Sequence, residues 1–175
     1  MKKRNLQLLA LSLFLVLAQN SLAVKLEQGT GSEAASEETV AIGISFTNEH
    51  GVTHKNIAGD STKPTDQYYA TAIGIANIAS GKRSSAFGFR NEASGESSSA
   101  FGYLNTASGE RSSAFGSQYK VTGDYSGAFG VGAVGESFHS YVNEGRHSYM
   151  IGNYNKIASG SDDNFILGNN VEIRA

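Results

Sequence analysis

The chain has 175 residues, a formal net charge of −2 and no cysteine. This length suits a single domain, and the mildly acidic balance disfavours nucleic acid as a partner, which would require a basic stripe. Without cysteine the chain has no disulfides, the usual means by which small secreted domains compensate for a thin hydrophobic core.

The N-terminus has the pattern of a secretory signal peptide. Basic residues 2–4 precede an apolar run over residues 6–18, and Ser21-Leu22-Ala23 has the small-x-small form of a cleavage site. The apolar run is too short for a membrane helix, which needs about twenty apolar residues. We therefore predict a signal peptide over residues 1–23 that is cleaved after Ala23, and a mature chain that is exported and has no membrane span.

The next segments lack a clear pattern. Residues 24–39 are rich in Gly, Ser and Glu, and we expect them to form a flexible N-terminal segment ahead of one domain over residues 40–175. The stretch 48–69 contains the single proline of the chain, whose missing N–H is hard to place in a paired strand. We interpret this stretch as either a loop excursion or a degenerate coil.

From Ala72 to Gly130 the sequence repeats every fourteen residues. Equivalent positions of successive repeats form columns: one holds Ala-Ile-Gly or Ala-Phe-Gly triplets, and another, seven residues later, holds Ala-Ser-Gly or Val-Thr-Gly triplets. Fixed self-similarity of this kind is the signature of a solenoid. The glycines of the first column are Gly74, Gly88, Gly102, Gly116 and Gly130, continued by Gly152 and Gly168.

The repeat favours strands over helices. Two glycines in every fourteen residues would each cost a helix about 1 kcal/mol relative to alanine, and the sequence lacks the apolar stripe of an amphipathic helix. Two short strands joined by tight corners fit each repeat, with equivalent residues about 4.8 Å apart in stacked coils. The sequence therefore predicts an all-β fold, a parallel β-solenoid with about fourteen residues per coil.

Alternation along each strand separates the side chains into two faces. We place the large residue of each triplet on the interior face, beside a serine that leaves room for the ring. Glu96, Glu110 and Asp124 are expected at a turn in solvent, because like charges stacked away from water would be destabilising. The predicted core ladder consists of Ile73, Phe87, Phe101, Phe115, Phe129, Ile151 and Leu167.

The register loosens after Gly130. The triplet column returns at Gly152, 22 residues later, so we expect irregular coils over residues 131–150 with a shortened coil around residues 137–141. Both columns then continue, with two residues inserted around Asp162 and Asp163. The sequence ends part-way through a coil.

Sequence motifs that could indicate cofactor or metal binding have simpler explanations in this chain. Residues 130–135 match the dinucleotide fingerprint, but that motif has meaning only between a strand and a helix. His50 and His54 lack a third metal ligand. Residues 162–164 could hold calcium, but the nonapeptide of calcium-binding β-rolls is absent and a turn explains them. We therefore predict no catalytic residues, no cofactor and no metal, and thus no enzyme.

The units Ser84–Gly88, Ser98–Gly102 and Ser112–Gly116, each followed by an Ala-Ser-Gly or Val-Thr-Gly half, resemble the YadA-like head repeat of trimeric autotransporter adhesins. The resemblance covers about residues 40–173. It implies a left-handed parallel β-roll of three identical chains, displayed at the outer membrane of a Gram-negative bacterium as a virulence-associated adhesin. The partners that it implies are host matrix proteins such as collagen, fibronectin or laminin, host cells, or other bacteria.

Two departures from the family's pattern bear on function. The Val-Ala-Ile of the family's Asn-Ser-Val-Ala-Ile-Gly unit here becomes Ser-Ala-Phe, which keeps a large residue beside a small one and leaves collagen binding open. The family's neck, stalk and membrane barrel do not follow the repeats, so we expect a secreted head or a fragment of a longer protein.

The sequence leaves more than one function open. The leading hypothesis is a surface-exposed adhesin head that binds host matrix or cells through many weak contacts. The alternative is a structural spacer, or a truncated head fragment, without a ligand of its own. A hexapeptide-repeat acyltransferase is disfavoured because its period is six residues rather than fourteen.

Overall fold

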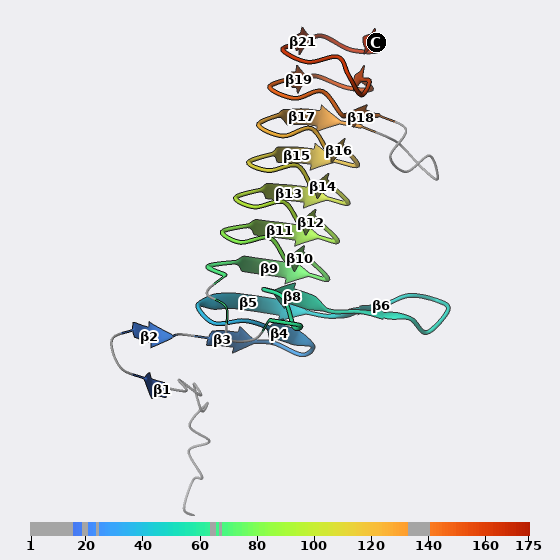
Figure 1. Ribbon diagram of the computed structural model, residues 1–175. Helices are drawn as coiled ribbons and strands as arrows, with labels where there is room; N and C mark the ends of the chain where they lie inside the picture. The colour runs from blue at the N-terminus through green and yellow to red at the C-terminus, as the bar shows by residue number, and fades with distance from the viewer. Residues whose placement is uncertain (1–15, 19–20, 24, 64–65, 67, 133–140) are drawn as a thin grey trace, which may run out of the picture.

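The computed structural model describes residues 16–18, 21–23, 25–63, 66, 68–132 and 141–175. Over these residues the chain forms strands, turns and bends, with no helix. The strands stack into a column of coils that rises from the N-terminal to the C-terminal end (Figure 1).

Two nine-stranded sheets run along the column, and each coil contributes one strand to each sheet. The long-strand sheet consists of β3 (Lys25–Gln28), β5 (Thr39–Ile44), β9 (Thr71–Ile75), β11 (Ser85–Phe89), β13 (Ser99–Tyr103), β15 (Ser113–Ser117), β17 (Gly127–Val131), β19 (Tyr149–Ile151) and β21 (Phe165–Leu167). The short-strand sheet consists of β4 (Ser32–Ala34), β8 (Asn56–Ala58), β10 (Ile78–Ala79), β12 (Glu92–Ala93), β14 (Thr106–Ala107), β16 (Lys120–Val121), β18 (Val142–Asn143), β20 (Lys156–Ile157) and β22 (Glu172–Ile173).

Neighbouring strands within both sheets are parallel and in register with the repeat. Phe101 of β13 pairs with Phe87 of β11 on one side and with Phe115 of β15 on the other. The prediction of a β-solenoid with coils of about fourteen residues is therefore confirmed. Two antiparallel hairpins lie outside the sheets: β1 (Val16–Ala18) with β2 (Ser21–Ala23), and β6 (Phe46–Thr47) with β7 (Thr53–His54).

The interior between the two sheets is lined by small residues. The alanines of the triplet column are completely buried, whereas the phenylalanines beside them are only partly buried. Leu167, at the end of the predicted core ladder, is 75% exposed. The buried alanines are Ala72, Ala86, Ala100, Ala114 and Ala128.

The predicted core ladder was therefore placed on the wrong face. The members of that ladder, Ile73, Phe87, Phe101, Phe115, Phe129, Ile151 and Leu167, all lie on the outer side of the long-strand sheet. A coil of fourteen residues closes so tightly that alanine side chains fill the space between the sheets. Because the side-chain period of a strand is two, a wrong choice of face moves every large residue to the opposite side.

The geometry of the stacked coils requires glycine at the repeat positions. Gly88 has a φ of +115°, and a Cβ atom there would lie 2.2 Å from the carbonyl oxygen of Gly102 in the next coil. Gly95, in the second triplet column, has no such φ, but its Cβ would lie 2.0 Å from the oxygen of Gly109. Backbones of successive coils therefore approach too closely for any side chain, both near the end of each long strand and at the corner after each short strand.

The N-terminal segment expected to be flexible is part of the solenoid. β3 pairs with β5, placing Leu26 opposite Val40, and β4 pairs with β8, placing Ala34 opposite Ala58. The expectation for residues 24–39 was wrong because its glycines form a corner rather than a flexible linker: Gly29 and Gly31 have φ values of +106° and +78°.

The stretch 48–69 contains both an excursion and part of a regular coil. The β6–β7 hairpin leaves the column after β5 and projects sideways from it (Figure 1). The chain then returns in β8, which pairs in register with β10. The hairpin is thus an insertion into one coil, and Pro64 lies outside the described residues.

The longer spacing after Gly130 belongs to a single coil. β17 pairs directly with β19, and β16 pairs directly with β18. The shortened coil expected around residues 137–141 falls almost wholly on residues that the structure does not describe, so it stays a prediction. Residues 133–140 themselves lie outside the described part of the chain.

The predicted signal peptide remains a prediction. Within residues 1–23, only β1 and β2 are described, and they pair antiparallel with Val16 opposite Ala23. In the described part of the chain, no helix has the length and apolar character needed to cross a bilayer.

Candidate interaction surface

The large triplet residues form a stack along the outside of the long-strand sheet. The ring centroids of Phe87 and Phe101 are 4.7 Å apart with an angle of 6° between the planes, and Phe101 and Phe115 stack at 4.7 Å and 4°. Phe115 and Phe129 continue the stack at 5.0 Å. This spacing follows the distance between neighbouring strands, so the backbone holds the rings in place.

A second column widens this apolar surface. Phe89 and Tyr103 stack at 5.4 Å, and Tyr103 is 46% exposed. We call the whole surface the outer aromatic face. Its large members are Ile42, Ile44, Ile73, Ile75, Phe87, Phe89, Phe101, Tyr103, Phe115, Phe129, Val131, Tyr149, Ile151, Phe165 and Leu167.

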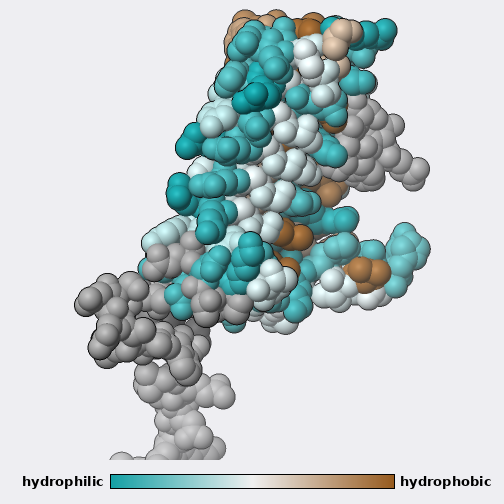
Figure 2. Space-filling view, in the orientation of Figure 1, coloured by the Kyte–Doolittle hydropathy of each residue, from teal (hydrophilic) through white to brown (hydrophobic). Residues whose placement is uncertain are grey.

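The outer aromatic face carries no charge. Among the outward positions of the described long strands from Val40 to Leu167, every residue is apolar, aromatic, glycine, serine or threonine. Soluble monomers rarely expose a contiguous apolar surface of this kind, and such a surface marks a site of protein association. The side turned to the viewer in Figure 2 is mainly hydrophilic or neutral, with hydrophobic residues at the C-terminal end and on the projecting hairpin.

The corner that follows the second triplet column has the opposite character. Arg83 lies 3.4 Å from Glu96, and Arg111 lies 3.4 Å from Glu110. The Glu110 N–H donates to the carboxylate of Asp124 at 2.9 Å, which relieves the stacking of like charges. The prediction that this corner is a turn in solvent is confirmed, since its charged side chains are exposed or half-exposed.

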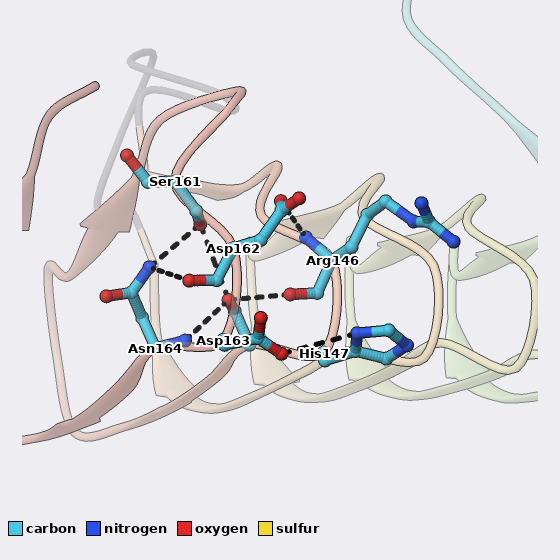
Figure 3. A network of polar contacts seen from close by, with 7 residues as sticks. Arg146, His147, Ser161, Asp162, Asp163 and Asn164 are labelled. Carbon is cyan, nitrogen blue, oxygen red and sulfur yellow. Dashed lines mark hydrogen bonds and ion pairs between the residues drawn. The ribbon is translucent and has the colours of Figure 1, made fainter.

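The last coils continue this charged corner (Figure 3). The Arg146 N–H donates to Asp162 at 2.9 Å, and His147 lies 3.4 Å from Asp163. The Asn164 amide donates to the carbonyl oxygens of Ser161 and Asp162 at 2.8 and 3.0 Å, which is the bonding of a turn. No three His, Asp or Glu residues in the described ranges come together as a metal site.

The two histidines considered as a metal pair have different surroundings. His50 is exposed near the tip of the hairpin, 3.7 Å from Glu49. His54 lies on the other strand, opposite Phe46, and its ring stacks on that phenylalanine at 6.4 Å and 21°. The two histidines are therefore four residues apart on a hairpin rather than on a helix, and their side chains have different contacts.

A buried asparagine column at the corner after the long strands was missed from the sequence. The Asn91 amide donates to the carbonyl oxygens of Phe87 and Gly102 at 2.8 and 2.7 Å. Its oxygen accepts the N–H of Asn105, and its own N–H donates to Asn77, both at 3.0 Å. The signal was present in the sequence as Asn77, Asn91 and Asn105, which lie fourteen residues apart. The buried members are Asn56, Asn77, Asn91, Asn105 and Asn155.

Tyr119 continues this hydrogen-bonded column across the coil that lies between Gly130 and Gly152. Its N–H donates to Asn105 at 3.1 Å, as an asparagine there would. Its hydroxyl group donates to the carbonyl oxygen of Gly152 at 2.8 Å and accepts the N–H of Asn155 at 3.3 Å. The buried ring therefore spans the coil in which Tyr141 replaces the asparagine.

Tyr119→Phe should lower the free energy of unfolding by about 1–2 kcal/mol, because two buried partners lose the hydroxyl group. Burial raises the pKa of Tyr119 above its ordinary value of 10.0, against a smaller lowering by the Asn155 N–H. The protonated tyrosine thus contributes stability that is complete below about pH 10 and is lost as the pH rises through the folded-state pKa. Urea unfolding at pH 7 and at pH 10–11 measures both effects. An unchanged alkaline slope in the variant would contradict this role.

The geometry defines the class of the protein: a parallel β-solenoid with a narrow alanine interior and an uncharged aromatic outer face. A family model described as the YadA head domain repeat matches the chain in two copies, over residues 68–91 and 93–118. These residues span the regular coils from β9 to β15. Residues 68–118 therefore form YadA-like head repeats, of a family that suggests an adhesin-type protein at the cell surface. A search of curated proteins found no match to this chain.

Proposed function

We propose that the chain is the head of a homotrimeric adhesin, whose three copies pack through the outer aromatic face. The observation that supports this most directly is the uncharged run of exposed rings and aliphatic side chains along the long-strand sheet. A single chain leaves Phe129, Tyr149 and Ile151 at 38%, 43% and 40% exposure. Burial against two further copies would remove this apolar area from water, at about 25 cal/mol for each Å².

The thin interior of one chain gives a second reason for assembly. One chain buries few large apolar side chains, because the interior between the sheets is built mainly of alanine. A domain with so little buried apolar volume is stabilised when a partner binds only the folded state. We infer three chains per assembly from the family of the repeat. Three copies can close into a ring in which every interface is identical.

The attachment surface would then be the side that faces away from the trimer axis. It presents the short-strand sheet and the charged corner, with equivalent positions repeated at each coil. Repetition over several coils and three chains raises overall avidity even where each contact is weak. We propose attachment to host matrix proteins or host cells as the role, after export through the signal peptide, with no enzymatic activity.

A binding array distinguishes this role from that of a spacer. The purified protein would be tested against immobilised collagen, fibronectin and laminin and against cultured host cells. Binding that weakens when the trimer is dissociated supports an adhesive head. A trimer that binds none of these surfaces would indicate a spacer.

A further inference from the structure

The β6–β7 hairpin stands over a cleft on the corner where the long strands turn into the short-strand sheet. The cleft has a volume of about 220 Å³, and His54 of the hairpin forms one wall. The opposite wall and floor come from three consecutive coils and include Arg90, Glu92, Leu104 and Thr106. His54 is the one lining residue from the hairpin, so the inserted hairpin closes one side of the cleft.

An aromatic contact fixes the hairpin against these coils. Phe46 packs edge to face on Phe89, with centroids 5.3 Å apart and an angle of 67°. The Arg90 guanidinium lies 5.8 Å from the centroid of Phe46, over its ring. This cation–π contact orients the guanidinium group without using its N–H donors.

The polar side chains of the cleft lack ion-pair partners. Arg83 and Arg111 each lie 3.4 Å from a carboxylate, whereas neither Arg90 nor Glu92 forms an ion pair with any residue in the described part of the chain. Arg90 is nevertheless half-buried. A planar guanidinium that is held in place with its donors unused is suited to bidentate binding of a carboxylate.

The remaining lining selects among carboxylate ligands. The N–H groups of Ile78, Glu92 and Thr106 already donate to the next coil at 2.8–2.9 Å, so a peptide cannot add as a strand. Glu92 and the Thr106 hydroxyl group can instead bond hydroxyl groups of a ligand, and Leu104 offers an apolar surface. A carboxylate, several hydroxyl groups and one apolar face together describe an acidic sugar.

We propose that this cleft binds a carboxylated pyranose residue of a glycan, with Arg90 holding the carboxylate and Glu92 and Thr106 the ring hydroxyl groups. The site supplies a ligand class for the proposed adhesive role and rests on that role for its biological meaning. The binding itself is testable apart from it: a trimer that fails to bind acidic sugars would refute the cleft and leave the proposed adhesin intact.

Saturation-transfer NMR of the purified protein with methyl β-D-glucuronide and methyl β-D-glucoside tests the proposal, because the two sugars differ only in the carboxylate. We expect binding of the glucuronide with a Kd of about 1 mM, as is usual for one small contact, and no saturation transfer to the glucoside. Arg90→Gln should weaken binding at least about tenfold. Thr106→Val, which leaves the hairpin contacts in place, should weaken it about threefold.

Arg146→Gln is the matched control, because Arg146 likewise forms no ion pair in the described residues but is exposed and lies on the opposite corner. It should bind the glucuronide as the unmodified protein does, and thermal unfolding of each variant shows that the fold is retained. Equal binding of the two sugars, an equal loss in Arg146→Gln, or tighter binding of N-acetyl-aspartate than of the glucuronide would each overturn the proposal.

Discussion

Phe101→Glu should convert the trimer into monomers while the solenoid of each chain remains folded. In one chain Phe101 lies on the outer side of the sheet, half-buried between the rings of Phe87 and Phe115. A glutamate there can reach water in the monomer. In the trimer, three carboxylates would be buried against apolar side chains without partners, at a cost of about 3 kcal/mol or more for each chain.

This cost should raise the dissociation constant of the trimer at least about hundredfold, since each 1.4 kcal/mol is a factor of ten. Size-exclusion chromatography with light scattering measures the mass of the variant, and circular dichroism reports on its strands. Ser108→Glu is the control: it introduces the same charge seven residues further along the same coil, at an exposed position directly after β14. If Phe101→Glu unfolded the chain or left the mass unchanged, the outer aromatic face would not be the interface.

Asn91→Ala should be the most destabilising change within one chain, with a loss of about 3–5 kcal/mol in the free energy of unfolding. The substitution leaves the N–H of Asn105 without its acceptor and takes a donor from the carbonyl oxygens of Phe87 and Gly102. Each buried polar group without a partner costs about 1–3 kcal/mol. Because Asn91 is 1% exposed, water replaces these bonds only at the cost of opening the coil.

Urea unfolding at one fixed protein concentration measures the loss. Gln28→Ala removes a side-chain amide from an exposed position of β3 and serves as the control, with an expected change within about 0.5 kcal/mol. Similar losses for the two variants would mean that the asparagine column does not support the coils.

The repeat predicted the architecture because its columns follow directly from the stacking of coils. Gly88 and Gly95 recur where successive backbones nearly touch, so their spacing of fourteen residues records the length of a coil. The choice of face was not recoverable in the same way. Alternation separates Ala100 from Phe101 but does not say which of them faces inward, and the larger residue was assigned to the interior.

The volume enclosed by a coil decides which face of the long strand points inward. The sequence indicates this volume only indirectly, through the length of the repeat. Fourteen residues that supply two strands and two corners leave room between the sheets for an alanine methyl group. The fully buried asparagines and serines at the corners, such as Asn105 and Ser98, also indicate a narrow interior. An interior lined by polar corners and methyl groups has no room for a row of phenyl rings.

The insertions explain the other differences between expectation and structure. The hairpin interrupts the coil between β5 and β8, and this hid the register of the N-terminal coil formed by β3 and β4. The cleft could not be foreseen because it depends on contacts between Phe46 and residues more than forty positions away, Phe89 and Arg90.

In the proposed trimer, the outer aromatic face is buried between three copies of the chain. Sedimentation equilibrium of the purified protein at micromolar concentration tests it most directly, because the chain mass of 18.4 kDa, less any cleaved leader, is known from the sequence. A homotrimer gives a single species of three chain masses, and this is the result we expect. A folded monomer with its aromatic face in water would contradict it.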